Sequence, residues 1–165
     1  MKRLVLLSLF VVLAAAAAFA NSTSTTLPVS ATLLPTVSVS TTNLDFGTWV
    51  LTDGVIPSSA TVTVQATAAT NYAITMDFGQ HFSAGWRHVQ NGAFGVIYEI
   101  LDPTGSFEWS DQGYGNTYPS GGPVFSTGTG SAQSFTANGL LFVASADPAS
   151  PIGLYSDLVT VTVNY

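Results

Sequence analysis

Apolar and polar residues alternate with a period of two in the last stretch of the chain. One face of this run carries Val159, Val161, Val163 and Tyr165. The opposite face carries Leu158, Thr160, Thr162 and Asn164. A period of two is typical of a half-buried β-strand, so the pattern predicts a strand that runs to the final residue.

A second alternating run lies near the start of the chain. Its apolar positions are Leu27, Val29, Ala31 and Leu33. Pro28 falls inside the run and has no backbone N–H to donate, which favours an edge strand or an added strand over a central one. Both ends of the chain therefore look like strands in need of partners. This points to assembly rather than catalysis, although the run could also be the first strand of its own domain.

Short strands separated by turn signals fill the middle of the chain. We expect strands at 44–49, 60–66, 72–78 and 94–101, and a hairpin within 134–144 whose tip is Asn138-Gly139. The Gly, Pro, Ser and Thr of residues 113–130 predict a long surface loop. Seven or so short strands without a helical period indicate an all-β sandwich.

The first twenty residues have the features of a removable export signal. Lys2 and Arg3 precede an apolar run that is too short for a comfortable membrane span, and Ala18-Phe19-Ala20 forms a cleavage site before Asn21. The remaining chain has one arginine, Arg87, against nine acidic residues. It therefore lacks the basic surface that nucleic acids and anionic membranes require, and we expect an exported protein without stable membrane insertion.

Several motifs occur together in an order that resembles a known family. They are Val37-Ser38-Val39, Leu44-Asp45-Phe46-Gly47-Thr48-Trp49, Val62-Thr63-Val64-Gln65-Ala66, Asn71-Tyr72-Ala73-Ile74, Tyr98, and a terminal Gly153-x-Tyr155-Ser156-Asp157-x-Val159-Thr160-Val161-Thr162-Val163. In this order they resemble the spore coat protein U-like domain family, which includes subunits of archaic chaperone-usher pili. The resemblance covers nearly the whole chain after the export signal, and the terminal motif is its most specific part.

The resemblance implies an immunoglobulin-like β-sandwich at 36–165 that lacks its last strand, preceded by an extension at 21–35. In this family a periplasmic chaperone fills the groove that the missing strand leaves. The extension of an identical or related subunit then replaces the chaperone at an outer-membrane usher. On this basis the donor strand would be Leu27, Val29, Ala31 and Leu33. The acceptor strand would be Val159, Val161, Val163 and Tyr165.

The protein would be periplasmic in transit and then part of a surface fibre that serves in adhesion or biofilm. A single domain with its own extension favours a shaft or adaptor subunit over a two-domain tip adhesin.

The chain departs from the family in one respect. Members commonly carry a cysteine before the first strand and another at the end of the Val-Thr-Val strand, and these positions are Thr36 and Ala66 here. The chain contains no cysteine at all, so we expect no disulfide to stabilise it.

Other chemistry is weakly indicated. His81 and His88 have no nucleophile elbow nearby, so we expect them in loops or at the surface. Asp102, Glu108 and Asp111 match no calcium-loop spacing, so we expect neither a metal nor a cofactor, and no enzymatic activity. The alternative to a fibre subunit is a self-contained module that binds glycans through aromatic loops. Its candidate residues are Trp86, Trp109, Tyr114 and Tyr118.

Overall fold

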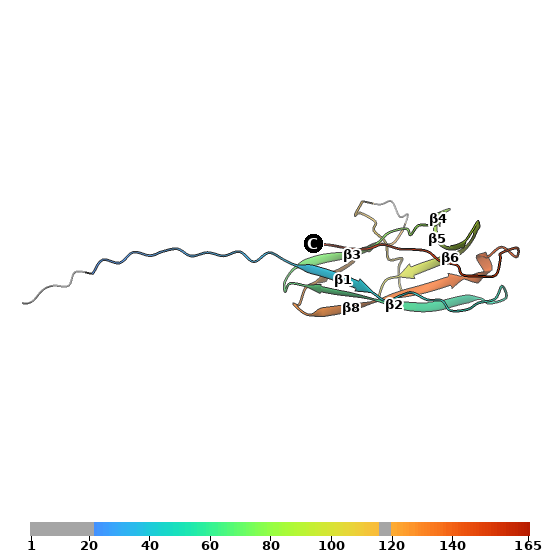
Figure 1. Ribbon diagram of the computed structural model, residues 1–165, viewed down its shortest axis with the longest axis horizontal. Coiled ribbons are helices and arrows are strands. Elements are labelled where there is room, and N and C mark those ends of the chain that lie inside the picture. The colour runs from blue at the N-terminus through green and yellow to red at the C-terminus, as the bar shows by residue number, and fades with distance from the viewer. Residues whose placement is uncertain (1–21, 116–119) are drawn as a thin grey trace, which may run out of the picture. The chain divides into compact units, whose positions relative to one another are not determined.

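A computed structural model of the protein describes residues 22–115 and 120–165 (Figure 1). The expected export signal at 1–20 lies outside these residues. The chain divides into two units, one ending at Leu33 and a compact one spanning Leu34–Tyr165. In the first unit, residues 22–33 form no regular secondary structure and their side chains are exposed. No helix in the described ranges is long and apolar enough to cross a membrane.

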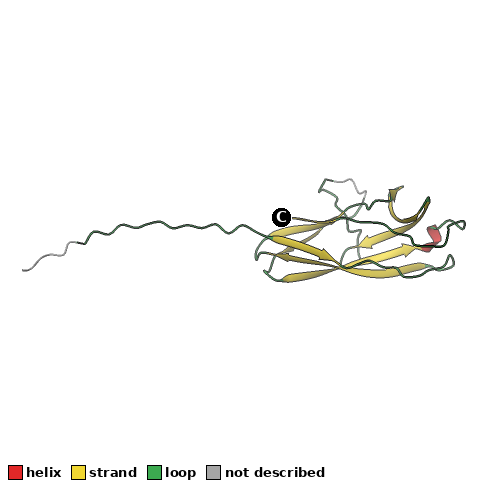
Figure 2. Cartoon of the chain, viewed as in Figure 1, coloured by secondary structure: helices red, strands yellow, loops and turns green. Residues whose placement is uncertain are grey.

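The compact unit consists of two antiparallel sheets (Figure 2). The larger sheet has the order β1-β2-β8-β6-β5-β4, and the smaller sheet has the order β7-β3-β9. Their bounds are β1 Val37–Thr41, β2 Val55–Ala66, β3 Asn71–Met76, β4 Phe82–Ser83, β5 Trp86–Asn91, β6 Phe94–Leu101, β7 Val124–Thr127, β8 Ala132–Phe142 and β9 Val161–Asn164. A single 3₁₀ turn, η1, spans Val143–Ser145. The expected all-β, immunoglobulin-like sandwich is confirmed.

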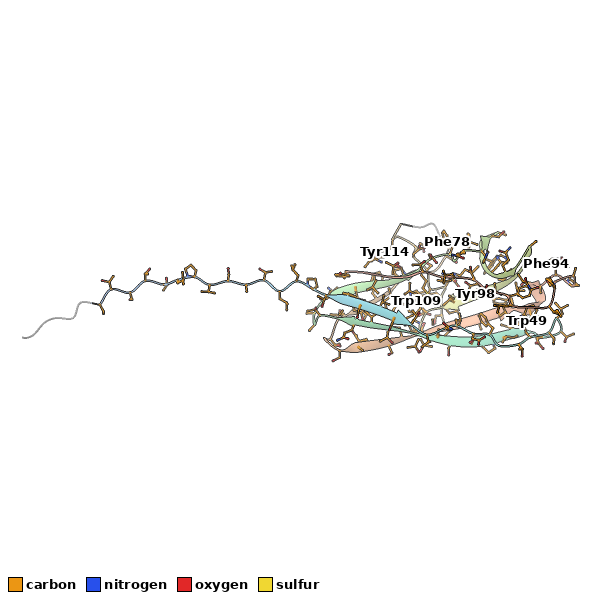
Figure 3. All side chains as sticks on the ribbon, in the orientation of Figure 1. Trp49, Phe78, Phe94, Tyr98, Trp109 and Tyr114 are labelled. Carbon is orange, nitrogen blue, oxygen red and sulfur yellow. The ribbon has the colours of Figure 1, made fainter. Side chains whose placement is uncertain are left out.

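The core lies between the two sheets and follows from the alternation of each strand. On β2, alternate residues from Ala60 to Ala66 are buried while their neighbours are not. β6 repeats the pattern with Val96, Tyr98 and Ile100, and β3 contributes Tyr72, Ile74 and Met76 from the opposite sheet. Burial of each large apolar side chain stabilises the fold by roughly 1.5–3 kcal/mol. Trp109 and Tyr98 lie in this layer in Figure 3.

The expected hairpin at 134–144 is wrong, because β8 runs without a turn from Ala132 to Phe142. Asn138 Nδ2 donates to the Asp102 carbonyl (2.8 Å) instead of shaping a turn. Gly139 is needed for close packing, since a Cβ there would lie 2.8 Å from Leu44 Cδ1. The Asn138-Gly139 pair therefore allows Leu44 to pack closely against β8 and does not form a turn.

Two further predictions need correction. Residues 44–49 are not a strand: Leu44 and Phe46 face the core, but the backbone forms no ladder. The loop predicted for 113–130 contains a strand, β7, which pairs with β3. Glycines lie close to both ends of Val124–Thr127, so the sequence around it resembles a loop. This four-residue strand is stabilised by its pairing with β3 rather than by local preference.

A buried cation connects the two sheets. Arg87 on β5 has no exposed surface and forms an ion pair with Glu108, which is 9% exposed. Its guanidinium also donates to the carbonyls of Asp77 (Nε, 3.0 Å) and Trp109 (Nη2, 3.0 Å). A buried ion pair is tolerated only when its remaining hydrogen-bonding groups find partners, and these carbonyls supply them.

We predict that Arg87→Ala destabilises the fold by about 3–5 kcal/mol, because Glu108 would remain as an unpaired buried charge. Urea unfolding followed by tryptophan fluorescence measures the loss. The double variant Arg87→Met/Glu108→Leu is the control and should recover much of the stability. Equal losses in the single and double variants would contradict the role given to the pair.

Candidate functional site: an open groove between two sheet edges

The sandwich is open along one side, where the segment that follows β1 faces the segment that precedes β9. Among the described residues, β1 pairs with β2 alone and β9 with β3 alone, so each strand has one free edge. Within the described residues no strand lies between these two edges. Val39 shows the consequence: it is 41% exposed, although its ladder partner Val64 is completely buried.

A groove of about 580 Å³ follows this open side. One wall is formed by residues 41–47 and Trp49, and the other by residues 153–159 and Val161. The floor consists of core side chains from both sheets: Ala60, Val62, Met76, Val89, Tyr98, Ile100, Ala137 and Leu141. The groove therefore reaches down to core side chains that are at most 8% exposed, Val89 excepted, and a strand lying in it would cover this floor while pairing its backbone.

The proposed acceptor residues occupy the second wall and its continuation. Val159, Val161 and Val163 are half-buried and packed against the core, whereas Thr160 and Thr162 are exposed. Only Val159 and Val161 line the groove itself. Tyr165 is 66% exposed and lines a different, shallow hollow over the outer face of the smaller sheet. The regular strand is also shorter than expected, since β9 spans Val161–Asn164.

The proposed donor residues lie in the other unit of the chain. Leu27, Val29 and Leu33 are 83%, 87% and 84% exposed, and Ala31 is exposed as well. The structure thus leaves the apolar face of this segment without cover.

A buried carboxylate holds the second wall in place. Asp157 Oδ1 accepts hydrogen bonds from Gln80 N (2.9 Å) and His81 N (3.1 Å), and lies 3.0 Å from His81 Nδ1. Asp157 Oδ2 accepts from the Tyr98 hydroxyl (2.6 Å). A Cβ at Gly79, where φ is +76°, would collide with this carboxylate. Asp157 therefore ties the terminal segment to β6 and to the 77–81 loop.

A second carboxylate fixes the point where the terminal segment joins the smaller sheet. Asp77 Oδ1 accepts from Thr160 N (2.8 Å) and from Gly79 N (2.9 Å), while Asp77 N donates to Thr160 O (3.1 Å). Upstream, Ser156 exchanges two backbone hydrogen bonds with Gln90 of β5. Residues 156–160 thus cross from one sheet to the other, held mainly by side-chain carboxylates.

The sequence analysis identified Asp157 as part of a motif but did not predict that it anchors the terminal segment. The signal that could have suggested one is its place in an apolar alternation, where an acidic residue at an inward position needs several donors. The roles of Asp77, His81 and Gly79 depend on contacts far apart in sequence. His81 was expected to lie in a loop, and it does, but with its ring against Asp157.

The alternative sites lose support. Trp109 was proposed as part of a sugar-binding platform, but it is fully buried and donates through Nε1 to Ile74 O (2.8 Å). Tyr118 lies outside the described residues. Trp86 belongs to β5 of the larger sheet. Tyr114 instead contacts Phe125 of β7 in the smaller sheet, with the two rings tilted and their centroids 6.4 Å apart. The structure therefore does not gather these aromatics into one platform.

Two of the three acidic residues considered as calcium ligands, Asp102 and Glu108, have other partners. Asp102 accepts from Thr104, Ser106 and Phe107, and these hydrogen bonds outweigh the effect of burial and hold the pKa of its carboxyl below the usual value. Glu108 pairs with Arg87. Across the described ranges there is no group of three or more side chains able to hold a metal ion.

We predict that Asp157→Asn destabilises the protein by about 1–3 kcal/mol, because an amide cannot replace a buried carboxylate that accepts from several donors. Hydrogen exchange should show faster exchange in residues 155–161 than elsewhere. Asp147→Asn is the matched control, since Asp147 is exposed and its carboxylate accepts from Ala149 N, an exposed turn contact. Its stability should change by less than about 0.5 kcal/mol. Uniform exchange in both variants would refute the anchoring role.

Comparisons with known proteins agree with this architecture. The family model of the Spore Coat Protein U domain matches residues 23–162. The fold is similar to a chain in the crystal structure of a CsuC–CsuE chaperone–tip adhesion subunit pre-assembly complex from the archaic chaperone-usher Csu pili of Acinetobacter baumannii. That match has a TM-score of 0.56 and 16% sequence identity, and it covers 81% of this chain and 40% of the other. No curated protein matches the sequence. From the family match and the sandwich fold, the chain belongs to the Spore Coat Protein U domain family.

Proposed function

We propose that this protein is an exported, non-enzymatic subunit of a surface fibre, assembled by donor-strand exchange. The observation that carries the proposal is the groove between residues 41–49 and 153–161, next to the free edges of β1 and β9. An unpaired strand edge is an aggregation hazard unless another chain covers it. The residues 22–33 of a neighbouring subunit are the proposed cover.

Length and pattern support this match. Leu27 to Leu33 spans about 20 Å when extended, at ~3.3 Å per residue. The groove wall from Gly153 to Val161 spans about 26 Å by the same measure, so the segment fits within it. The period of two places Leu27, Val29, Ala31 and Leu33 on one face, toward the floor.

The energetics favour insertion. Leu27, Val29 and Leu33 are nearly fully exposed in the free chain. Burial of each gains roughly 1.5–3 kcal/mol, so the three contribute about 5–9 kcal/mol before the cost of ordering the segment. Backbone hydrogen bonds to the free edges add affinity, as in other strand-addition complexes.

The direction of the donor follows from the sheets. β9 is antiparallel to β3, and β3 to β7, so the smaller sheet is antiparallel throughout. A donor that continues this order runs antiparallel to β9, the pairing that is slightly more stable per residue. It would thus complete the sandwich with a strand in the same arrangement.

The same groove needs a temporary occupant before assembly. We propose a periplasmic chaperone for this task and an outer-membrane usher for the exchange, in line with the chaperone–subunit complex to which the fold is similar. The subunit would then pass through the periplasm to a cell-surface fibre, where adhesion and biofilm formation are the expected roles.

We predict that Val29→Asp abolishes assembly, because it would place an unpaired charge in the apolar groove. Light scattering after size-exclusion chromatography of residues 21–165 measures the oligomers. Ser30→Asp is the matched control: it lies on the same segment but on the opposite face, so assembly should continue. Oligomers of Val29→Asp with wild-type size and yield would rule out the proposed donor.

A further inference from the structure

The end of the sandwich where the groove begins carries large apolar side chains that the fold does not cover. They are Val50 (59% exposed), Leu51 (47%), Val55 (51%), Ile152 (101%) and Leu154 (82%). We call these five residues the apolar end. Single exposed apolar residues are ordinary, but several of them at one end of a fold indicate an interaction surface.

Contacts within the fold bring the two segments of the apolar end together. The Trp49 and Tyr155 rings meet edge to face with centroids 5.4 Å apart, and the Tyr155 hydroxyl donates to Pro151 O (2.9 Å). A turn closed by Asp53 N to Val50 O (2.8 Å) leads directly to Val55. Figure 3 labels Trp49 at this end of the sandwich, where β2 begins and β8 ends.

The opposite end of the sandwich, which we call the base, is where β1 begins. Thr36 is anchored there, since its carbonyl accepts from Thr67 N (3.0 Å) and its amide donates to Thr67 Oγ1 (3.0 Å). The adjoining loops, 67–70 and 128–131, contain only Thr, Ala, Gly and Ser. This neutral surface can approach an apolar one without the cost of desolvating a charge.

The direction of the donor decides which surfaces meet. The terminal wall runs from Tyr155, at the apolar end, to Asn164, which pairs with Ala73 near the base. A donor antiparallel to it enters at the base of the acceptor and leaves at the apolar end. Its own subunit must therefore begin beside the acceptor's apolar end.

The connection between donor and body is too short to keep the two subunits apart. Only Leu34 and Pro35 separate Leu33, the last donor residue, from the anchored Thr36. Three residue steps reach at most about 10 Å, which is also the distance between two packed sheets. The base of one subunit thus lies within one layer of side chains of its neighbour's apolar end.

Leu34 has the chemistry to fill that layer. It follows Leu33 directly, so it is out of phase with the donor face and points away from the groove floor. Leu34 is 72% exposed in the free chain, and from this position its side chain would not contact the groove floor.

We propose that the apolar end is a second contact between consecutive subunits, covered by Leu34 and the base loops of the next copy of this chain. The proposal rests on the proposed donor-strand function and adds a head-to-tail surface to it. Such a contact is heterologous, because two different patches of the same chain meet, and it therefore propagates along a fibre instead of closing a dimer.

The absence of cysteine in the chain allows a clean crosslinking test. The double variant Leu34→Cys/Leu154→Cys of residues 21–165 is assembled, oxidised with copper phenanthroline and separated on a denaturing gel. We expect a reducible ladder of trimers and larger species, since each subunit would crosslink to both neighbours. The control pair is Leu34→Cys/Phe125→Cys, because Phe125 is 69% exposed but lies on the outer face of the smaller sheet. It should give no species larger than a dimer.

The outcomes separate this contact from donor exchange. Oligomers detected by light scattering without a ladder overturn the contact and leave donor exchange standing. A ladder that persists after adding Val29→Asp overturns the proposal that the donor brings the two surfaces together. Failure of the wild-type chain to form oligomers overturns the proposed function and this contact with it.

Discussion

The free edges of β1 and β9 are the constraint on which the rest of this structure depends. Two sheets enclose a core only if their edges are paired or covered, and within the described residues no strand pairs with the outer edge of β1 or of β9. The groove beside them has core side chains such as Val62 and Tyr98 at its floor. Under the proposed function, the strand that fills this groove comes from another chain, which would couple stability to assembly.

A domain that lacks a strand must keep its groove open by other means. Here charged side chains that are buried or half-buried provide this support. Arg87 joins β5 to the 77–81 loop and to Glu108, and Asp157 and Asp77 fasten the terminal segment to that same loop. Buried charges with several hydrogen bonds hold one geometry, because any shift leaves a charged group without partners. We infer that these carboxylates preserve an acceptor wall that lacks a full ladder of its own.

The sandwich could be predicted from the sequence because its strands follow the two-residue period. Residues 94–101 and the terminal alternation illustrate this, and so does the family motif. The roles of Gly139, Arg87 and Asp157 could not be predicted. Gly139 follows Asn138, a pair that favours a turn in isolation, but its position in β8 is set by Leu44 packing across it. The partners of Arg87 and Asp157 come from distant segments, which local patterns do not reveal. The donor face was visible as an alternation, and its partner remains a proposal.

The most direct test of the account is binding of a peptide of residues 22–35 to a chain that begins at Pro35, measured by isothermal titration calorimetry and thermal unfolding. The compact unit spans Leu34–Tyr165, so the shortened chain retains almost all of it. The account predicts one peptide bound per chain, a raised melting temperature, and new hydrogen-exchange protection in β1 and β9. A shortened chain that is monomeric, as stable as residues 21–165 and indifferent to the peptide would contradict it.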